Sequence, residues 1–214
     1  MEIYSIEVGP VLTMSYVVYD KLTKDAIIID VPLQSHRLLY DFIKQKGLKV
    51  HGILLTHSHW DHTADVPELM KLLNVPIYIH QSDEYRLLEP KKYSVFELSF
   101  KLLPFPADKY LKDAEELSFG SLQFSILHTP GHTEGSICIY FKNDKTVFSG
   151  DTLFNMSVGR TDLLGGNWDT LYNSIKNKLL VLPDTTDVYC GHGESTTIGL
   201  ERQYNPFLIE NTLL

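Results

Sequence analysis

The feature that most constrains this chain is the run HSHWDH at positions 57–62. It follows the apolar stretch Val50–Leu55, which predicts a buried strand, after a single threonine. Zinc and iron favour imidazole and carboxylate ligands, and four such side chains within six residues can face both ions of a metal pair. The run therefore predicts a ligand loop at the end of a strand, on a scaffold that brings further ligands to it.

Three further candidate ligands occupy the same kind of place. They are His132 in TPGHT, Asp151 in SGDT and His192 in CGHG. The strands that precede them are expected at Leu122–Leu127, Thr146–Phe148 and Asp187–Cys190. A strand end fixes the backbone, and a neighbouring glycine lets it approach closely. Any one of these residues alone could be a hydrogen-bonded structural residue, but together with the first run they predict one site.

The remaining pattern predicts an α/β chain of layered sheets covered by helices. Further strands are expected at Met1–Val8, Thr13–Tyr19, Ala26–Val31, Ile77–His80 and Ile137–Phe141. Helices are expected at Leu33–Lys46, Asp65–Leu73, Ser82–Leu88, Trp168–Leu180 and Leu200–Leu208. The stretch Lys91–Asp113, with its prolines and mixed pattern, is expected to be a long loop or lid. Periodicity does not decide between one sheet and two.

Length and charge narrow the class of protein. At about 150 residues per domain, 214 residues predict a single domain over 1–214. The net charge of −8 gives no attraction to nucleic acid or anionic lipid, and no apolar run approaches the ~20 residues that span a bilayer. Two cysteines and an acidic start without a leader pattern favour a cytoplasmic protein. We expect neither a nucleic-acid nor a membrane partner, and either a monomer or a homodimer.

In their order along the chain, HSHWDH, TPGHTEGS, FSGDTLF and CGHG resemble the motifs of the metallo-β-lactamase superfamily over almost the whole chain. The resemblance implies an αβ/βα four-layer sandwich with a dinuclear metal site at one edge of its two sheets. It implies a first ion held by His57, His59 and His132, a second held by Asp61, His62 and His192, and Asp151 bridging both. The implied cofactors are two divalent ions, zinc foremost, with iron or manganese as alternatives.

The finer pattern resembles glyoxalase II and its single-domain bacterial relatives. Asp151 stands where β-lactamases with a cysteine ligand carry Cys, and His59 stands where the di-iron flavoproteins carry Glu. The run GDTLFNMSVGRTDLLGGNWDTLYNSI and the tail HGESTTIGLERQYNPFL carry the likeness. The resemblance implies hydrolysis of a small-molecule thioester of the hydroxyacylglutathione type by a metal-bridging hydroxide, oriented by Asp61. Glyoxalase II proper adds a C-terminal helical domain for glutathione, whereas 22 residues follow His192 here.

Residues beside the ligands have expected supporting roles. Arg160 is a candidate for binding a substrate carboxylate, although the pattern favours an Arg160–Asp162 pair that braces the loop. Asp30 ends the apolar run AIIID and is expected, like Asp162, to support the ligand loops from behind. Three other residues are expected to be structural: His80, His128 and a buried, unreactive Cys190. Trp60 is expected to cover the site or to pack its loop.

Three rival functions remain open at this level. A persulfide dioxygenase on the same fold would hold one iron through His57, His132 and Asp151, a two-His-one-carboxylate set with open positions for oxygen. A lactonase or β-lactamase-like hydrolase would use the same two ions on another substrate. A binding module without catalysis would hold no metal.

Overall fold

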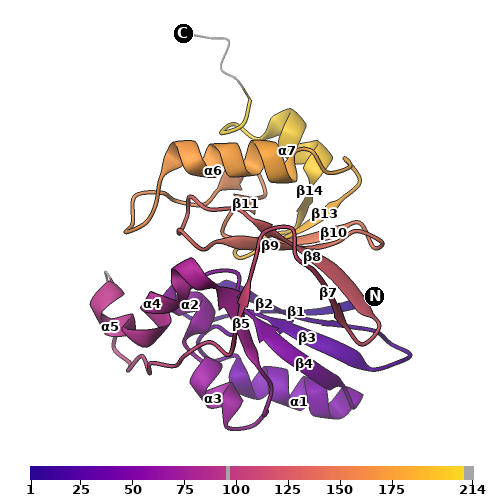
Figure 1. Cartoon of the computed structure of the whole chain (residues 1–214), viewed down its shortest axis with the longest axis vertical. Helices are drawn as coiled ribbons and strands as arrows, with labels where there is room; N and C mark the ends of the chain where they lie inside the picture. Colours follow the sequence, from indigo (N-terminus) through magenta and orange to yellow (C-terminus); the bar gives the residue numbers. More distant parts are fainter. Residues whose placement is uncertain (95–96, 210–214) are drawn as a thin grey trace.

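Two six-stranded sheets packed face to face form the centre of the molecule (Figure 1). The computed structural model describes residues 1–94 and 97–209. The first sheet runs in the order β1 (Glu2–Val8), β2 (Thr13–Tyr19), β3 (Asp25–Ile29), β4 (Lys49–Leu54), β5 (Ile77–His80) and β6 (Lys109–Leu111). The second runs in the order β14 (Thr196–Thr197), β13 (Asp187–Cys190), β10 (Thr146–Gly150), β9 (Ile137–Phe141), β8 (Leu122–His128) and β7 (Glu116–Phe119). The question of one sheet or two is thereby answered.

Helices cover the outer face of each sheet, which gives the four-layer αβ/βα arrangement that the family resemblance implies (Figure 1). The helices are α1 (His36–Lys46), α2 (Trp60–Thr63), α3 (Val66–Met70), α4 (Glu84–Leu88), α5 (Pro90–Tyr93), α6 (Trp168–Ser174) and α7 (Ile198–Tyr204). Helices α1 and α3 lie against the first sheet, whereas α6 and α7 lie against the second. In the part of the chain that the structure describes, none of these helices has the length and apolarity to cross a membrane.

Burial follows from this layering. Strands β3, β9 and β10 are buried along their whole length because both faces of each are covered. Helix α1 turns Leu39 and Ile43 toward the first sheet and ends at Gly47, whose φ of 62° is readily adopted by glycine. Apolar clusters fill the space between the sheets and the space under each helical layer.

The two sheets mix parallel and antiparallel pairs, and the parallel pairs place the site. Strands β3, β4, β5 and β6 are parallel in the first sheet, and β10 and β13 are parallel in the second. The carboxyl ends of parallel strands meet at one edge of a sheet, where the connecting loops can carry functional residues. The segments that contain HSHWDH, Asp151 and His192 each leave such an edge.

Most expected elements are present, with shifts at their ends. The loop expected over Lys91–Asp113 is wrong in part, because β6 pairs with β5 in parallel through Lys109, Tyr110 and Leu111. This three-residue strand has too little pattern of its own, and its existence depends on the exposed edge of β5. The expected helix Trp168–Leu180 changes to a π-helical turn at Ile175–Leu179. Strands β7 and β14 and the short hairpin of β11 (Leu153–Phe154) and β12 (Ser157–Val158) were not expected.

Candidate metal centre

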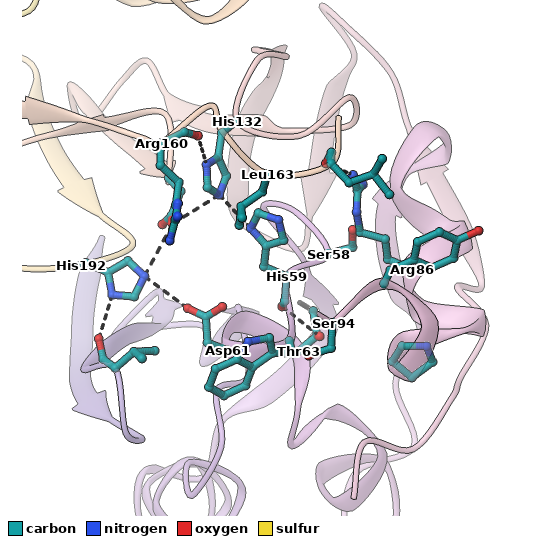
Figure 2. Close-up of a pocket in the computed structure, with 16 residues that line it drawn as sticks. Ser58, His59, Asp61, Thr63, Arg86, Ser94, His132, Arg160, Leu163 and His192 are labelled. Atoms are coloured by element: carbon teal, nitrogen blue, oxygen red, sulfur yellow. Dashed lines mark hydrogen bonds and ion pairs between the residues drawn. The ribbon is translucent and has the colours of Figure 1, made fainter. Parts of the chain in front are cut away.

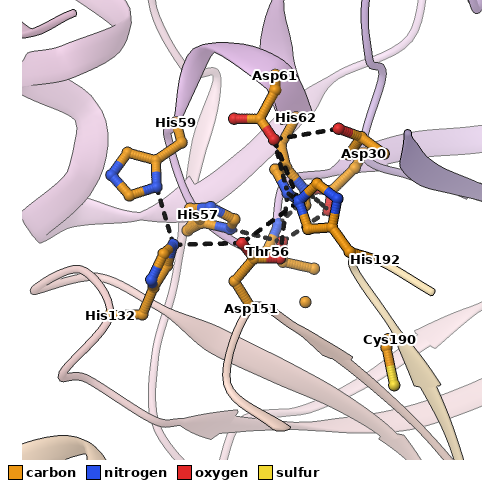
Figure 3. Close-up of polar contacts among 12 residues, drawn as sticks. Asp30, Thr56, His57, His59, Asp61, His62, His132, Asp151, Cys190 and His192 are labelled. Atoms are coloured by element: carbon orange, nitrogen blue, oxygen red, sulfur yellow. Dashed lines mark hydrogen bonds and ion pairs between the residues drawn. The ribbon is translucent and has the colours of Figure 1, made fainter. Parts of the chain in front are cut away.

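Seven candidate ligands from four distant segments converge at one edge of the sandwich (Figure 3). They are His57, His59, Asp61, His62, His132, Asp151 and His192. The first four lie in the loop after β4 and in α2, while Asp151 directly follows β10 and His192 comes two residues after β13. His132 lies in the loop between β8 and β9. The sequence predicted this set, and the fold brings all of it together.

Donor atoms fall into three groups in which every pair lies within 4.8 Å. The groups are His57, His59 and His132, then His57, His62 and Asp151, then Asp61, His62 and His192. Asp151 connects the outer two, since its Oδ2 lies 3.4 Å from His132 Nε2 and its Oδ1 lies 3.2 Å from His62 Nε2. This is the arrangement expected of two three-ligand sites that share one carboxylate.

Within the part of the chain that the structure describes, two buried polar atoms of the cluster have no hydrogen-bond partner. His57 Nε2 is one, and Asp151 Oδ1 is the other, apart from the approach of His62 Nε2 at 3.2 Å. Buried nitrogen and oxygen atoms in proteins almost always have a hydrogen-bond partner, so two unpaired atoms with lone pairs that face one cluster indicate a missing partner. Imidazole nitrogens with carboxylate oxygens are the set that zinc, iron or manganese accept. The cluster therefore fits divalent metal ions.

The outer nitrogen of four imidazoles is hydrogen-bonded so that the inner nitrogen faces the cluster. His62 Nδ1 donates to Asp30 Oδ2 at 2.7 Å, and His132 Nδ1 donates to the carbonyl of Arg160 at 2.8 Å. His192 Nδ1 bonds to backbone carbonyls at 3.2 Å, and His57 Nδ1 lies 3.1 Å from the Thr56 hydroxyl. Such bonds fix the tautomer and turn the lone pair of each inner nitrogen toward a metal.

Asp30 is the residue behind two of these rings. Its carboxylate accepts from the backbone and the hydroxyl of Thr56 at 2.8 and 2.7 Å, as well as from His62. Because the Thr56 hydroxyl donates to Asp30, it accepts from the Nδ1–H of His57. The contacts expected of Asp30 from the sequence are thus present. Its φ of 57° is left-handed, a conformation that aspartate tolerates better than most residues.

Burial and charge divide the imidazoles into two kinds. Burial, together with the neighbouring His62, holds the pKa of His57 well below its usual value, and burial beside His132 lowers the pKa of His59 to about 3. These rings stay neutral, as ligands must. For His192, burial acts to lower the pKa, but the carboxylates of Asp151 and Asp61 raise it to about 9.

The carboxylates show the matching shifts. Burial by itself raises the pKa of Asp151, yet His62 and His192 keep that pKa well below its usual value. Burial likewise opposes ionisation of Asp61, and His62 and His192 lower its pKa. The pKa of His62 is raised by Asp151, Asp61 and Asp30 in spite of its burial. Ionised carboxylates draw positive charge into this half of the cluster, so a cation is the partner that they favour.

A cavity of about 220 Å³ opens beside the cluster (Figure 2). Its walls combine His59, Asp61, His132 and His192 with apolar side chains of Val11, Trp60, Pro90, Tyr93, Leu163 and Leu164. Trp60 lines the cavity and packs against Phe100 with ring centroids 5.5 Å apart, as expected of a residue that packs the loop. An organic group could lie against this apolar wall with its reacting atom at the ligands.

Other candidates from the sequence have ordinary structural surroundings. Arg160 lines the cavity, but its guanidinium donates two hydrogen bonds of 2.7 Å to Asp162, and both side chains are more than half exposed. This is the bracing pair that the pattern favoured. His80 at the end of β5 and His128 at the end of β8 stack with their ring centroids 3.9 Å apart. Burial raises the pKa of Cys190 to about 12.

Two residues that the sequence did not single out belong to the surroundings of the site. Asp83 is fully buried and accepts hydrogen bonds from Ser58 and Thr133, which lie in the loop of His57 and His59 and in the loop of His132. Arg86 lines the cavity and donates to Asp83. An acid and a base three residues apart are a common helical pair, so spacing gives no signal for them. Only the folded structure brings them to the loops.

Comparison with curated proteins yields close relatives of similar length. A probable metallo-hydrolase of Bacillus subtilis, YqgX, is 38% identical over 202 residues, which cover 94% of each chain. The hydroxyacylglutathione hydrolase GloC of Haemophilus influenzae is 37% identical over 188 residues, 86% of this chain and 88% of its own.

Solved structures share the whole fold. The B3 metallo-β-lactamase BLEG-1 has a TM-score of 0.90 at 39% identity, covering 97% of this chain and all of its own. TTHA1623, solved in a di-iron-bound form, has a TM-score of 0.85 at 36% identity, covering 96% and 100%. ETHE1 from Myxococcus xanthus has a TM-score of 0.79 at 28% identity, covering 96% and 84%. Residues 8–192 also match the family described as the metallo-beta-lactamase superfamily, and the chain belongs to that superfamily.

Proposed function

We propose that this protein is a metal-dependent hydrolase of thioesters of the hydroxyacylglutathione type. The observation that carries the proposal is the pair of three-ligand groups around Asp151 at the floor of an apolar-walled cavity. The identity of 37% with a hydroxyacylglutathione hydrolase supports the substrate class. The ligands proposed for the first ion are His57, His59 and His132, and those for the second are Asp61, His62 and His192, with Asp151 shared.

Two divalent ions held there, zinc in the first instance, would supply a deprotonated water near neutral pH and a Lewis acid for the substrate carbonyl. In this proposal Asp61 orients the attacking hydroxide. Its Oδ2 accepts a hydrogen bond of 3.1 Å from the Thr13 hydroxyl and lies 3.3 Å from His192 Nε2, while the residue faces the cavity. A carboxylate held on one side in this way can accept a hydrogen bond from the hydroxide on the other and so orient it.

The leaving group decides the substrate class in this proposal. When a thioester is hydrolysed, the C–S bond breaks and the sulfur departs as a thiolate whose conjugate acid has a pKa of about 8.5. Such a group needs no proton from the enzyme, whereas an amide nitrogen does. Among the described residues, 1–94 and 97–209, the titratable side chains that line the cavity apart from the proposed ligands are Arg86, Tyr93 and Arg160, which are two guanidinium groups and a phenol.

The cavity wall would hold the rest of the substrate. Leu163, Leu164 and Trp60 exclude water from the reacting carbonyl, which strengthens electrostatic interactions there. Arg160 stands at the same wall with its guanidinium exposed, where it can exchange Asp162 for a substrate carboxylate. Glutathione carries two carboxylates, so it is a fitting thiol for this residue.

The experiment combines metal analysis with two assays on the purified protein. We expect two divalent ions per chain and hydrolysis of S-lactoylglutathione that is lost on chelation and restored by zinc, iron or manganese. Asp151→Ala should retain the fold but lose at least one ion and most of the turnover. Full occupancy by two ions in Asp151→Ala would contradict the ligand assignment.

The rival dioxygenase is distinguished in the same preparation. One iron held by His57, His132 and Asp151, oxygen uptake with glutathione persulfide and no thioester turnover would refute the proposed function. A lactone or β-lactam turned over in place of S-lactoylglutathione would keep the two ions and change the substrate. A protein with no affinity for metal would be a binding module.

A further inference from the structure

One buried carboxylate outside the ligand set joins the two loops that carry the first ligand group. Asp83 ends the short 3₁₀ turn Gln81–Asp83 after β5 and has no exposed surface. Its Oδ2 accepts from the backbone N–H and the hydroxyl of Ser58, both at 2.8 Å, and from the hydroxyl of Thr133 at 2.9 Å. Its Oδ1 accepts from the backbone N–H of Gly135 at 2.7 Å and from Arg86 at 3.2 Å.

The donors belong to the two ligand loops. Ser58 stands between His57 and His59, and Thr133 directly follows His132. The same carboxylate therefore bonds to the backbone or side chain of a residue next to each ligand of this group. Since both oxygens are used, a shift of either loop would break bonds at Asp83.

The loop that carries His132 and Gly135 packs closely against this carboxylate. A Cβ atom built on Gly135 would lie 2.7 Å from the Cβ, Cγ and Oδ1 atoms of Asp83, closer than side chains tolerate. Glycine at this position lets the backbone N–H reach Asp83 at 2.7 Å. The contact thus fixes the position of the loop as well as its hydrogen bond.

The geometry of the first ligand group depends on how the two loops meet. His59 Nδ1 and His132 Nε2, one from each loop, lie 2.8 Å apart. The outer nitrogen of His132 is held by the carbonyl of Arg160, and that of His57 by the Thr56 hydroxyl. The ring of His59 bonds to His132 on the other loop, and the backbone next to it is held by Asp83 at Ser58, so the place of His59 depends on how Asp83 joins the two loops.

We propose that Asp83 is a positioning residue that sets the metal affinity of the group His57, His59 and His132 by locking its two loops together. Asp30 has the corresponding place behind His62 and the group Asp61, His62 and His192. Asp30 bonds directly to the ring of His62 and reaches His57 of the other group through the Thr56 hydroxyl. Asp83 thus holds the loops of one ion, and Asp30 acts chiefly on the other. The inference rests on the metal binding in the proposed function.

The test is Asp83→Asn in the full chain, with metal affinity as its readout. Asparagine keeps the size of the side chain but replaces one acceptor oxygen by an NH₂ group that faces donors. Loss of such a supporting contact typically weakens metal binding 10–100-fold. We expect one of the two ions to bind 10–100-fold more weakly in a Zn²⁺ titration against a competing chelator, while the other keeps its wild-type affinity.

A spectroscopic signature identifies which ion is weakened. With Co²⁺ as the probe, Asp83→Asn should retain the absorption of the ion held by Asp61, His62 and His192. The reciprocal variant Asp30→Asn should weaken the other ion more strongly, so that the Co²⁺ spectrum that remains is that of the three-imidazole group. Identical residual spectra in the two variants would overturn the division of the site.

Asp25→Asn is the matched control. Asp25 is a buried carboxylate at the start of β3, far along the sheet from the ligand loops, and it accepts from His51 Nε2 at 2.6 Å and from the Ser121 N–H at 3.0 Å. This variant should lower the melting temperature and leave both metal affinities unchanged. If Asp83→Asn behaves in the same way, Asp83 only braces the fold and the inference is wrong.

Gentler variants keep the question open to test if Asp83→Asn does not fold. Thr133→Val and Ser58→Ala each remove one donor to Asp83 and leave the carboxylate in place. Each should weaken the same ion several-fold, and unchanged affinity in both would overturn the inference. A wild-type protein without metal affinity would overturn the proposed function itself, whereas two tightly bound ions in Asp83→Asn would overturn only the role of Asp83.

Discussion

Replacement of Asp30 by asparagine should convert one proposed metal ligand, His62, to the wrong tautomer. In the wild type, His62 Nδ1 donates to Asp30 Oδ2 at 2.7 Å, which leaves the lone pair of Nε2 facing Asp61 and Asp151. An asparagine NH₂ group at this position is a donor, so His62 must accept at Nδ1 and carry its proton on Nε2. That proton points into the place where the ion would lie.

The magnitude follows from the bond that is lost. A hydrogen bond to a charged group is worth about 1.5–3 kcal/mol, and 1.4 kcal/mol is a factor of ten in affinity, so the ion next to His62 should bind about 10–150-fold more weakly. Backbone strain adds little, because asparagine also tolerates the left-handed conformation that Asp30 has at φ 57°. The Oδ1 bond from the Thr56 N–H can persist.

The assay is a Zn²⁺ titration against a chelator, paired with ¹⁵N NMR of the His62 ring. In the Asp30→Asn protein we expect the ion next to His62 to be weakened more than the other, which Asp30 reaches through Thr56 and His57, and we expect the His62 imidazole to be protonated at Nε2. Unchanged affinity for both ions would refute the reasoning, as would equal weakening of both, because Asp30 would then act through general stability. A weakened ion with the proton still on Nδ1 would refute the tautomer argument alone.

Three further predictions concern other parts of the chain. Arg160→Ala should raise KM for S-lactoylglutathione more than it lowers kcat, since the loss of binding that is equal in ground state and transition state appears in KM. Because the pair of Arg160 with Asp162 is exposed, the substitution should change the free energy of unfolding by less than about 1 kcal/mol. An unchanged KM would leave only the bracing role. The hydrogen bond from His51 lowers the pKa of Asp25, so this carboxylate stabilises the fold above its unfolded pKa of about 3.9, and the stabilisation is lost as the pH falls. In urea unfolding, the free energy of unfolding should therefore fall less between pH 7 and pH 3 in Asp25→Asn than in the wild type. Equal decreases in the two proteins would contradict the pairing. Burial raises the pKa of Cys190 to about 12, so iodoacetamide at pH 8 should label it in denaturant and leave it unlabelled in the native protein, a result that mass spectrometry decides.

The cluster of candidate ligands could be predicted because its signals are local. HSHWDH places four donors beside one strand, and the glycines next to Asp151 and His192 mark strand ends where the backbone can approach a metal. Strands buried on both faces are continuous apolar runs, and Gly47 ends α1 at a left-handed residue. Each of these features depends on residues within one turn or one strand, so no knowledge of the fold is needed to find it.

Features that depend on long-range pairing could not be predicted. The three residues of β6 become a strand only because β5 offers an unpaired edge, and the partition into two sheets depends on pairing between segments far apart in the sequence. The supporting contacts are of the same kind, since Asp83 reaches Thr133 across 50 positions and Asp30 reaches His62 across 32. The sequence by itself determined which side chains are candidate ligands. Only the tertiary structure decided which buried carboxylates orient them, because a hydrogen bond acts over about 3 Å in space and leaves no spacing in the chain.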